Sequence, residues 1–161
     1  MKGKARPQRR PRVLAIASGG GHWIQLLRIR PAFEGFETAY CSVHAAYAMQ
    51  VPGHRYYNVH DVSRRNPLGF FLVTWQLLRL LLRERPDVLV TTGAAPALVA
   101  IVLSRAMGTR TLWIDSIANC DRLSTSGDLA RRIAHRVVRF AHRRVRRARR
   151  GAVLGRAATT R

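Results

Sequence analysis

The sequence contains few cysteines and almost no lysine. Cys41 and Cys120 are its two cysteines; they lie far apart, and no metal-ligand spacing surrounds either of them. We therefore interpret both as reduced, buried, small apolar residues rather than as a disulfide. Both lysines lie within the first four residues. The absence of lysine elsewhere excludes a phosphate-binding P-loop, whose motif requires a lysine after its glycines.

Long hydrophobic runs are also absent. No stretch reaches the ~20 consecutive apolar residues that a membrane span requires. Residues 70–82 come close but are interrupted by Gln76 and Arg79, whereas residues 88–103 are uncharged but divided by a glycine and a proline. The apolar run before the first glycines is too short for a signal peptide. We expect a cytoplasmic protein, peripheral at the inner face of the cell membrane.

Acidic residues are scarce, with eight against 29 lysines and arginines, for a net charge of +21. The excess lies at the two ends. Residues 1–12 carry six basic residues and no acid, and residues 128–161 carry twelve arginines and one acid. Residues 13–127 carry eleven arginines and seven acids. Basic arms of this kind bind anionic surfaces, and the charge by itself does not distinguish lipid from nucleic acid.

The length of 161 residues and the apolar fraction of 47% predict one folded domain. Such a chain is too short for a separate domain for each of two substrates. We place a basic arm at 1–11, the domain at 12–138 and an arginine-rich tail at 139–161.

The order of apolar runs, prolines and glycines predicts an α/β fold with a doubly wound parallel sheet of the Rossmann-like type. Trp23 and Trp75 are expected to face the core. The predicted strands cover 12–18, 37–44, 55–62, 87–93 and 109–116, and the predicted helices cover 22–31, 66–86, 95–108 and 126–150.

Three predicted strands end in segments rich in small or polar residues: SGGGH (18–22), TTGAAP (91–96) and DSIAN (115–119). Ligands of open parallel sheets bind at the carboxyl ends of strands, where backbone N–H groups of helix N-termini face an anion. Convergence of the three segments favours a ligand cleft over simple tight turns. The glycines do not match G-x-G-x-x-G, and no acid ends the second strand, so a dinucleotide site is disfavoured and no cofactor is expected.

Two titratable residues lie beside this predicted cleft. His22 begins the first helix, where its ring can reach the cleft. Asp115 ends the fifth strand and is either a general base or a cap that forms loop hydrogen bonds. The other histidines near the second and third strands, His44, His54 and His60, lack ligand spacing, so we expect no metal site.

The segments SGGGHWIQLLRIRPAF, VLVTTGAAPALVAIVLSRAMGTRTLWIDSIAN and DRLSTSG together resemble the PssD family of bacterial exopolysaccharide glycosyltransferase subunits. They are also similar to the membrane-recruiting subunit of the eukaryotic UDP-N-acetylglucosamine transferase of lipid-linked oligosaccharide synthesis. The resemblance covers residues 12 to about 138. It implies the N-terminal half of a GT-B glycosyltransferase similar to the peptidoglycan enzyme MurG.

The resemblance also assigns the site. It implies an inverting transfer from a UDP-sugar, held by a small partner chain, to a lipid-linked (polyprenyl diphosphate) saccharide, with this chain inactive alone. His22 and Asp115 become the candidate catalytic residues. The residues implied to bind the acceptor diphosphate are Ser18, Gly19, Gly20, Gly21, Thr92, Gly93, Pro96, Ser116 and Asn119.

Two other functions remain open from the sequence. The chain could be a non-catalytic, membrane-recruiting scaffold for a catalytic partner. Nucleic-acid binding through the basic tail is disfavoured because no base-reading motif accompanies the charge. The sequence departs from the family pattern after about residue 138, so the tail is either a lipid-binding arm or the product of a shifted reading frame.

Overall fold

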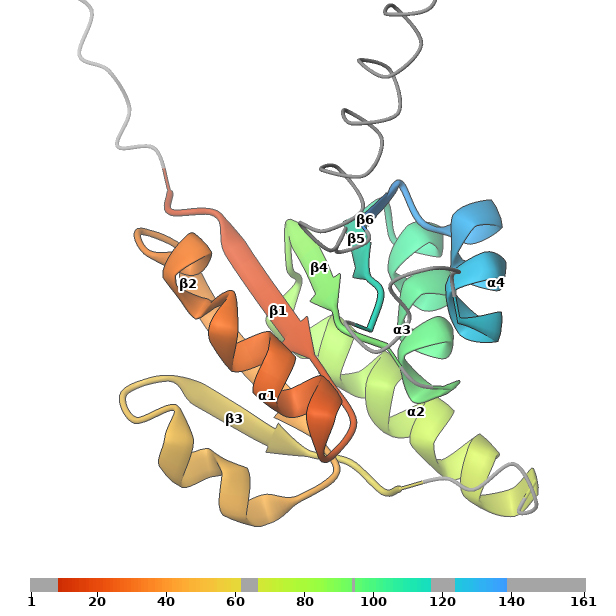
Figure 1. Cartoon of the computed structure of the whole chain (residues 1–161), viewed down its shortest axis with the longest axis horizontal. Helices are drawn as coiled ribbons and strands as arrows, with labels where there is room; N and C mark the ends of the chain where they lie inside the picture. Colours follow the sequence, from red (N-terminus) through yellow and green to blue (C-terminus); the bar gives the residue numbers. More distant parts are fainter. Residues whose placement is uncertain (1–8, 62–66, 94, 117–123, 139–161) are drawn as a thin grey trace, which may run out of the picture.

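The structure is a computed structural model that describes residues 9–61, 67–93, 95–116 and 124–138. Its six strands are all parallel and lie in the order β3-β2-β1-β4-β5-β6 (Figure 1). This confirms the predicted doubly wound α/β sheet. The strands are β1 (Arg12–Ile16), β2 (Glu37–Ser42), β3 (Arg55–Asn58), β4 (Val88–Thr91), β5 (Arg110–Ile114) and β6 (Arg136–Val138). The helices are α1 (Gly21–Arg28), α2 (Pro67–Glu84), α3 (Ala95–Ala106) and α4 (Thr125–Ile133), with 3-10 turns η1 (Arg30–Phe33) and η2 (Ala45–Gln50).

Both faces of the sheet are buried, because helices cover each of them. Successive residues of a strand point to opposite faces. Leu14 of β1 packs with α2, α3 and α4, in a cluster that includes Leu77 and Trp113. Ala15 packs on the other face with Trp23 and its neighbours of α1 and η2. Burial on both faces explains why β1 is a continuous apolar run rather than an alternating one.

The predicted helix at 126–150 was wrong in its extent. Helix α4 ends at Ile133, and the chain then turns at Ala134 into β6, which pairs with β5. A backbone hydrogen bond from the Asp115 N–H to the Val138 carbonyl, 2.8 Å long, joins the two strands. The branched side chains of Val137 and Val138 favour this extended form. The strand was not predicted because the arginines around these two valines continue a helical pattern in the sequence. Residues 139–150 lie outside the described part of the chain.

One predicted core tryptophan is buried and the other is not. Trp23 is 1% exposed, whereas Trp75 on α2 is 57% exposed, so the core prediction for Trp75 was wrong. Cys41 is a buried, free cysteine, as predicted, and burial raises the pKa of its thiol to about 12. Cys120 and most of the two predicted basic arms lie outside the described residues.

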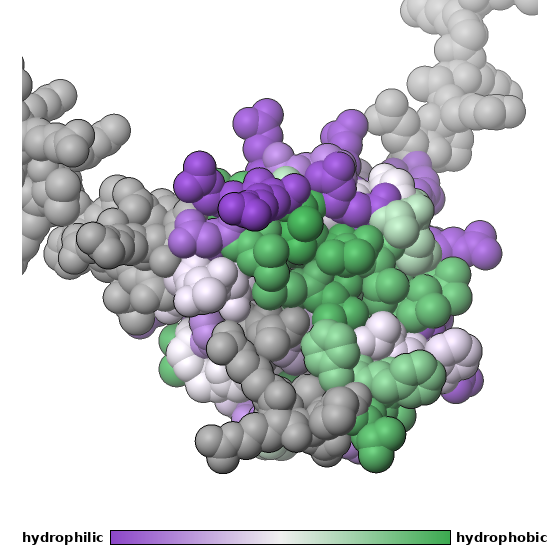
Figure 2. All heavy atoms as spheres, turned by 90° about the vertical axis from the view of Figure 1, so that its right-hand side faces the viewer, coloured by the Kyte–Doolittle hydropathy of each residue, from purple (hydrophilic) through white to green (hydrophobic). Residues whose placement is uncertain are grey.

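Helix α2 buries one side and exposes the other. Val73 and Leu77 are fully buried in the core. Large apolar side chains on the opposite side are exposed, and Figure 2 shows apolar surface gathered on the face that carries α2, α3 and α4. The exposed members on α2 are Leu68 (82%), Phe70 (46%), Phe71 (75%), Leu72 (41%), Trp75 (57%) and Leu82 (54%), which we call the α2 apolar surface.

Candidate functional site

The glycine loop connects the carboxyl end of β1 to the first turn of α1. Gly20 precedes the helix with φ 62° and ψ −133°, a conformation that favours glycine because it has no Cβ. The Gly20 N–H donates to the Tyr47 hydroxyl at 3.1 Å. Helix α1 has no acidic residue in its first turn, so nothing there opposes an anion at its positive end. Gly21, the first residue of α1, is exposed.

Two hydrogen bonds join the glycine loop to the loop after β4. The His22 Nδ1 lies 2.7 Å from the Thr92 carbonyl oxygen, and the Thr92 hydroxyl donates to the His22 carbonyl, also at 2.7 Å. Gly93 has φ 121°, and a Cβ there would lie 3.0 Å from His22 Cε1. A residue other than glycine at position 93 would therefore strain the backbone and crowd the His22 ring.

The contact with Thr92 also fixes the chemical form of the His22 ring. A carbonyl oxygen only accepts hydrogen bonds, so Nδ1 must carry the proton. In the neutral imidazole the lone pair is then on Nε2. His22 is half-buried, with its ring held on one side and Nε2 left as the basic atom. This is the arrangement of a histidine that can accept a proton.

Asp115, the second predicted catalytic residue, is 1% exposed and anchors the start of α4. Its Oδ1 accepts from the Ser124 hydroxyl at 2.7 Å and from Trp113 Nε1 at 3.3 Å, and its Oδ2 accepts from the Ser124 N–H at 2.9 Å. Ser124 in turn caps α4 by accepting from the Gly127 N–H at 2.9 Å. These bonds match the cap alternative that the sequence left open, and the role of Asp115 as a base stays a prediction.

The described residues of all three predicted loops lie at the same edge of the sheet, where β1, β4 and β5 end. The Gln25 side chain of α1 donates to the Asp115 carbonyl at 2.8 Å, which joins the first loop to the third. Ser18 is half-buried, and its carbonyl accepts from the Ser42 hydroxyl at 3.2 Å. Pro96 is buried and Ser116 is half-buried, whereas Asn119 lies outside the described residues.

The sequence analysis missed two residues beside the glycine loop. His44 and Tyr47 follow β2, and both contact the loop. Strands β1 and β2 are parallel neighbours, with Ile16 opposite Cys41, so their carboxyl ends meet at one edge. The position of His44 as the last residue of a predicted strand was the signal that could have found it. Among the residues that the structure describes, no group of three or more His, Cys, Asp or Glu could hold a metal ion.

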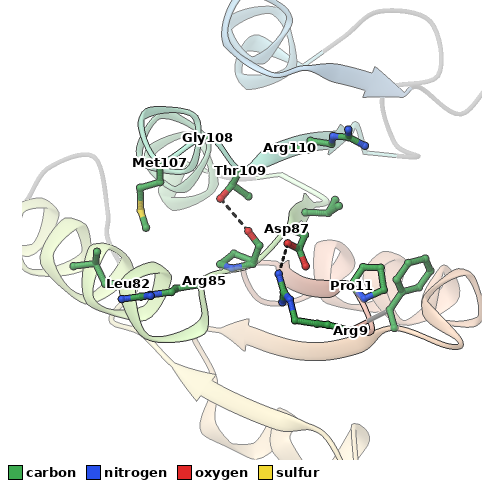
Figure 3. A pocket seen from close by; sticks show the side chains of 12 residues that line it. Arg9, Pro11, Leu82, Arg85, Asp87, Met107, Gly108, Thr109 and Arg110 are labelled. Atoms are coloured by element: carbon green, nitrogen blue, oxygen red, sulfur yellow. Dashed lines mark hydrogen bonds and ion pairs between the residues drawn. The ribbon is translucent and has the colours of Figure 1, made fainter. Parts of the chain in front are cut away.

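A pocket of about 940 Å³ lies at the opposite edge of the sheet, where β1, β4 and β5 begin (Figure 3). Arg9, Arg85 and Arg110 line it, together with Asp87. Asp87 accepts from Arg9 Nη2 at 2.7 Å and from the Arg12 N–H at 2.8 Å. The Arg12 N–H and the Arg9 charge hold the pKa of Asp87 below its ordinary value. This pocket is separate from the candidate site, and its ion pair holds the start of β1 to the start of β4.

Comparison with known proteins supports the fold. No family profile matches the chain, and no curated protein sequence matches it significantly. Among solved structures, MurG of Acinetobacter baumannii is similar, with a TM-score of 0.65 and 16% identity over 80% of this chain and 41% of that one. UDP-N-acetylglucosamine 2-epimerase of Rickettsia bellii gives a TM-score of 0.62 and 14% identity over 86% of this chain and 41% of that one.

A third structure, MnaA of S. aureus with UDP, gives a TM-score of 0.62 and 11% identity over 81% of this chain and 39% of that one. The chain therefore spans about two fifths of the length of these proteins. Its fold is that of one Rossmann-like half of a GT-B protein. The narrower resemblance to PssD subunits stays a prediction.

Proposed function

We propose that this chain is the acceptor-side subunit of a two-component, membrane-associated glycosyltransferase. In this proposal a partner chain with the other GT-B half holds the UDP-sugar, and the described chain binds a lipid-linked saccharide diphosphate. The likeness to one half of MurG and of the UDP-sugar epimerases supports it. So does the position of the three loops at the carboxyl edge of the sheet, where open α/β sheets bind ligands.

The observation that carries the proposal is the hydrogen bond from His22 Nδ1–H to the Thr92 carbonyl. It leaves the lone pair on Nε2, and this atom takes the proton of the acceptor hydroxyl. The hydroxyl oxygen forms a bond to the anomeric carbon of the sugar while the bond from that carbon to the UDP oxygen breaks. Attack from the side opposite UDP inverts the anomeric centre.

The glycine loop and the first turn of α1 hold the acceptor diphosphate in this mechanism. Gly19 and Gly21 bring the backbone close to the anion, and the positive end of α1 stabilises its charge. Holding the diphosphate beside His22 places the acceptor hydroxyl of the attached saccharide within reach of the base. The developing charge on UDP is met by groups of the partner chain.

The membrane part of the proposal rests on the α2 apolar surface. None of the helices in the described ranges is both long and apolar enough to cross a bilayer. Phe71 and Trp75, at 75% and 57% exposure, give α2 large side chains that can enter the acyl boundary of a membrane surface. Such contact would place the chain at the inner face of the membrane, where it meets a polyprenyl-linked acceptor.

The test is a transfer assay with the purified chain, with a purified chain of the UDP-sugar-binding GT-B half, and with the two together. Radiolabelled UDP-N-acetylglucosamine and UDP-glucuronate are offered with a polyprenyl diphosphate saccharide. We expect transfer only from the mixture. Full transfer by this chain alone contradicts the two-chain proposal. Full transfer by a mixture that contains His22→Gln favours the alternative of a non-catalytic scaffold.

A further inference from the structure

We infer that His44 and Tyr47 form a second wall of the diphosphate site, beside the glycine loop, and bind the anion directly. The inference rests on the proposed function, because it assigns the anion to this edge of the sheet. It adds a binding element from the turn after β2, which neither the three predicted loops nor the glycine motif includes.

The His44 ring lies directly against the glycine loop. A Cβ placed on Gly19 would come within 2.5 Å of His44 Nε2 and 2.7 Å of Cδ2, so any other residue at position 19 would displace the ring. The loop therefore uses glycine here to admit a side chain from a neighbouring strand. A ligand that approaches the Gly19 backbone meets the His44 imidazole at the same time.

Tyr47 is the second contact, and it is rigidly held. Its ring stacks on Trp23, with centroids 4.8 Å apart and planes 6° from parallel, and the His44 ring meets it edge-on at 5.1 Å. Its hydroxyl accepts the Gly20 N–H. Because the oxygen is the acceptor in that bond, its own proton remains to be donated. No residue in the described part of the chain accepts it, so a phosphate oxygen beside Gly20 can.

Hydrogen bonds hold the backbone of the turn, whereas the His44 ring is held by packing on Gly19 and Tyr47. The His44 carbonyl accepts from the Tyr47 N–H at 3.2 Å and from the Tyr56 hydroxyl. Burial raises the pKa of Tyr56 to about 12, so this hydroxyl stays a donor. The His44 ring is exposed, and neither of its nitrogens forms a hydrogen bond with a described residue. In either charge state the ring offers at least one N–H to an anion.

The two histidines therefore take different tasks. His22 has its Nδ1–H bound to Thr92, which leaves the lone pair of Nε2 as its available atom. His44 has no such partner within the described ranges and is free to donate. A site with one held base and one free donor can bind a diphosphate and still accept a proton from the sugar hydroxyl.

The experiment titrates the full chain, labelled with ¹⁵N-histidine, with inorganic pyrophosphate and follows the ring signals by NMR. Each signal is assigned by its own His→Ala variant. We expect the signals of His22 and His44 to shift together along one binding curve. The His60 ring bonds to Gln76 in the middle of α2, and its signal is expected to stay unchanged.

Variants separate binding from folding. We expect His44→Ala to weaken pyrophosphate binding about tenfold, corresponding to the loss of one hydrogen bond to a charged group. Tyr47→Phe keeps the ring on Trp23 but removes the hydroxyl that accepts the exposed Gly20 N–H, so it is expected to lower affinity several-fold with only a small drop in melting temperature. His60→Ala is the matched control and should bind as the wild type does.

The outcomes distinguish the inference from the proposal beneath it. A shift at His22 with none at His44, and wild-type affinity in His44→Ala, overturns the inference and leaves the proposed function intact. A shift at neither residue overturns both. A shift of all histidines together indicates non-specific binding to a basic protein and also overturns the inference.

Discussion

His22 and Thr92 exchange two hydrogen bonds, each 2.7 Å long, across loops that lie 70 residues apart in the sequence. The ring of His22 donates to the Thr92 carbonyl, and the Thr92 hydroxyl donates to the His22 carbonyl. The pair fixes the position of the proposed base and the nitrogen that carries its lone pair. We therefore expect loss of the His22 ring and loss of the Thr92 hydroxyl to have different effects.

Replacing His22 by Gln removes the basic nitrogen. We expect turnover of the two-chain enzyme to fall about 100-fold or more, the usual contribution of a general base. Radiolabel transfer from the UDP-sugar measures it. Thr92→Val is the matched control, because it deletes the hydroxyl but keeps the carbonyl. It should cost about 1 kcal/mol of the free energy of unfolding and leave most of the turnover. Equal loss of turnover in both variants would contradict proton transfer by His22.

Gly93→Ala is expected to lower both stability and transfer. The residue has φ 121°, and the added Cβ would lie 3.0 Å from His22 Cε1, so the ring must move. Gly35→Ala is the control. Gly35 also has a positive φ, 84°, but has open space where the Cβ would be. Differential scanning fluorimetry should show strain in both variants, of about 1–3 kcal/mol each. Transfer should fall only for Gly93→Ala, and loss in both would assign it to strain alone.

Asp115→Asn should act mainly on stability. The change removes the charge from a buried carboxylate with three hydrogen bonds, and we expect a loss of about 2 kcal/mol in the free energy of unfolding. Ser124→Ala, which removes the cap of α4, should cost about 1 kcal/mol. Urea unfolding measures both. If Asp115→Asn unfolds like the wild type while turnover of the complex falls 100-fold, Asp115 is the base and the anchoring role is secondary.

The Asp87 carboxylate predicts a dependence of stability on pH. Its pKa is lowered below the ordinary 3.8 by the Arg12 N–H first and then by Arg9. A carboxylate with a depressed folded-state pKa stabilises the fold above the unfolded value, and this stabilisation disappears as pH falls through the folded value.

Asp87→Asn should therefore melt below the wild type at neutral pH, and the difference should shrink below pH 3.8 and vanish in stronger acid. Melting curves at several pH values, in low salt, measure it. Glu34→Gln, at an exposed position with no described ion pair, is the control and should show no such trend. A difference that stays constant into acid would mean that the charge of Asp87 does not stabilise the fold.

Trp75 provides a probe of membrane contact. It is 57% exposed on the α2 apolar surface, whereas Trp23 and Trp113 are buried. We expect anionic lipid vesicles to shift its fluorescence to the blue, and Phe71→Glu to reduce co-sedimentation with vesicles several-fold. Val102→Glu changes an exposed apolar residue of α3 and tests whether the contact is confined to α2. A Trp75 signal that does not respond to vesicles contradicts membrane docking by this helix.

The parts of the fold that sequence predicted are those set by local patterns. Five of the six strands and the helices between them follow from apolar runs bounded by glycine and proline. The sixth strand was missed because Val137 and Val138 lie among arginines that continue a helical pattern. Beside the pairing of β6 with β5, the His135 Nδ1 lies 3.1 Å from the Thr111 N and 2.9 Å from the Thr111 hydroxyl oxygen. A contact across 24 residues leaves no local signal.

The sequence by itself determined the parallel sheet and the edge where its loops meet, because strand order and buried runs require them. It also marked His22 and Asp115 as the groups to examine. Tertiary structure decided the hydrogen-bond partners of each, because those partners lie at a distance in the chain. The Thr92 carbonyl determines that the lone pair of His22 lies on Nε2. The Ser124 hydroxyl donates a hydrogen bond to the Asp115 carboxylate. The ring of His44 reaches the glycine loop only because β2 lies beside β1.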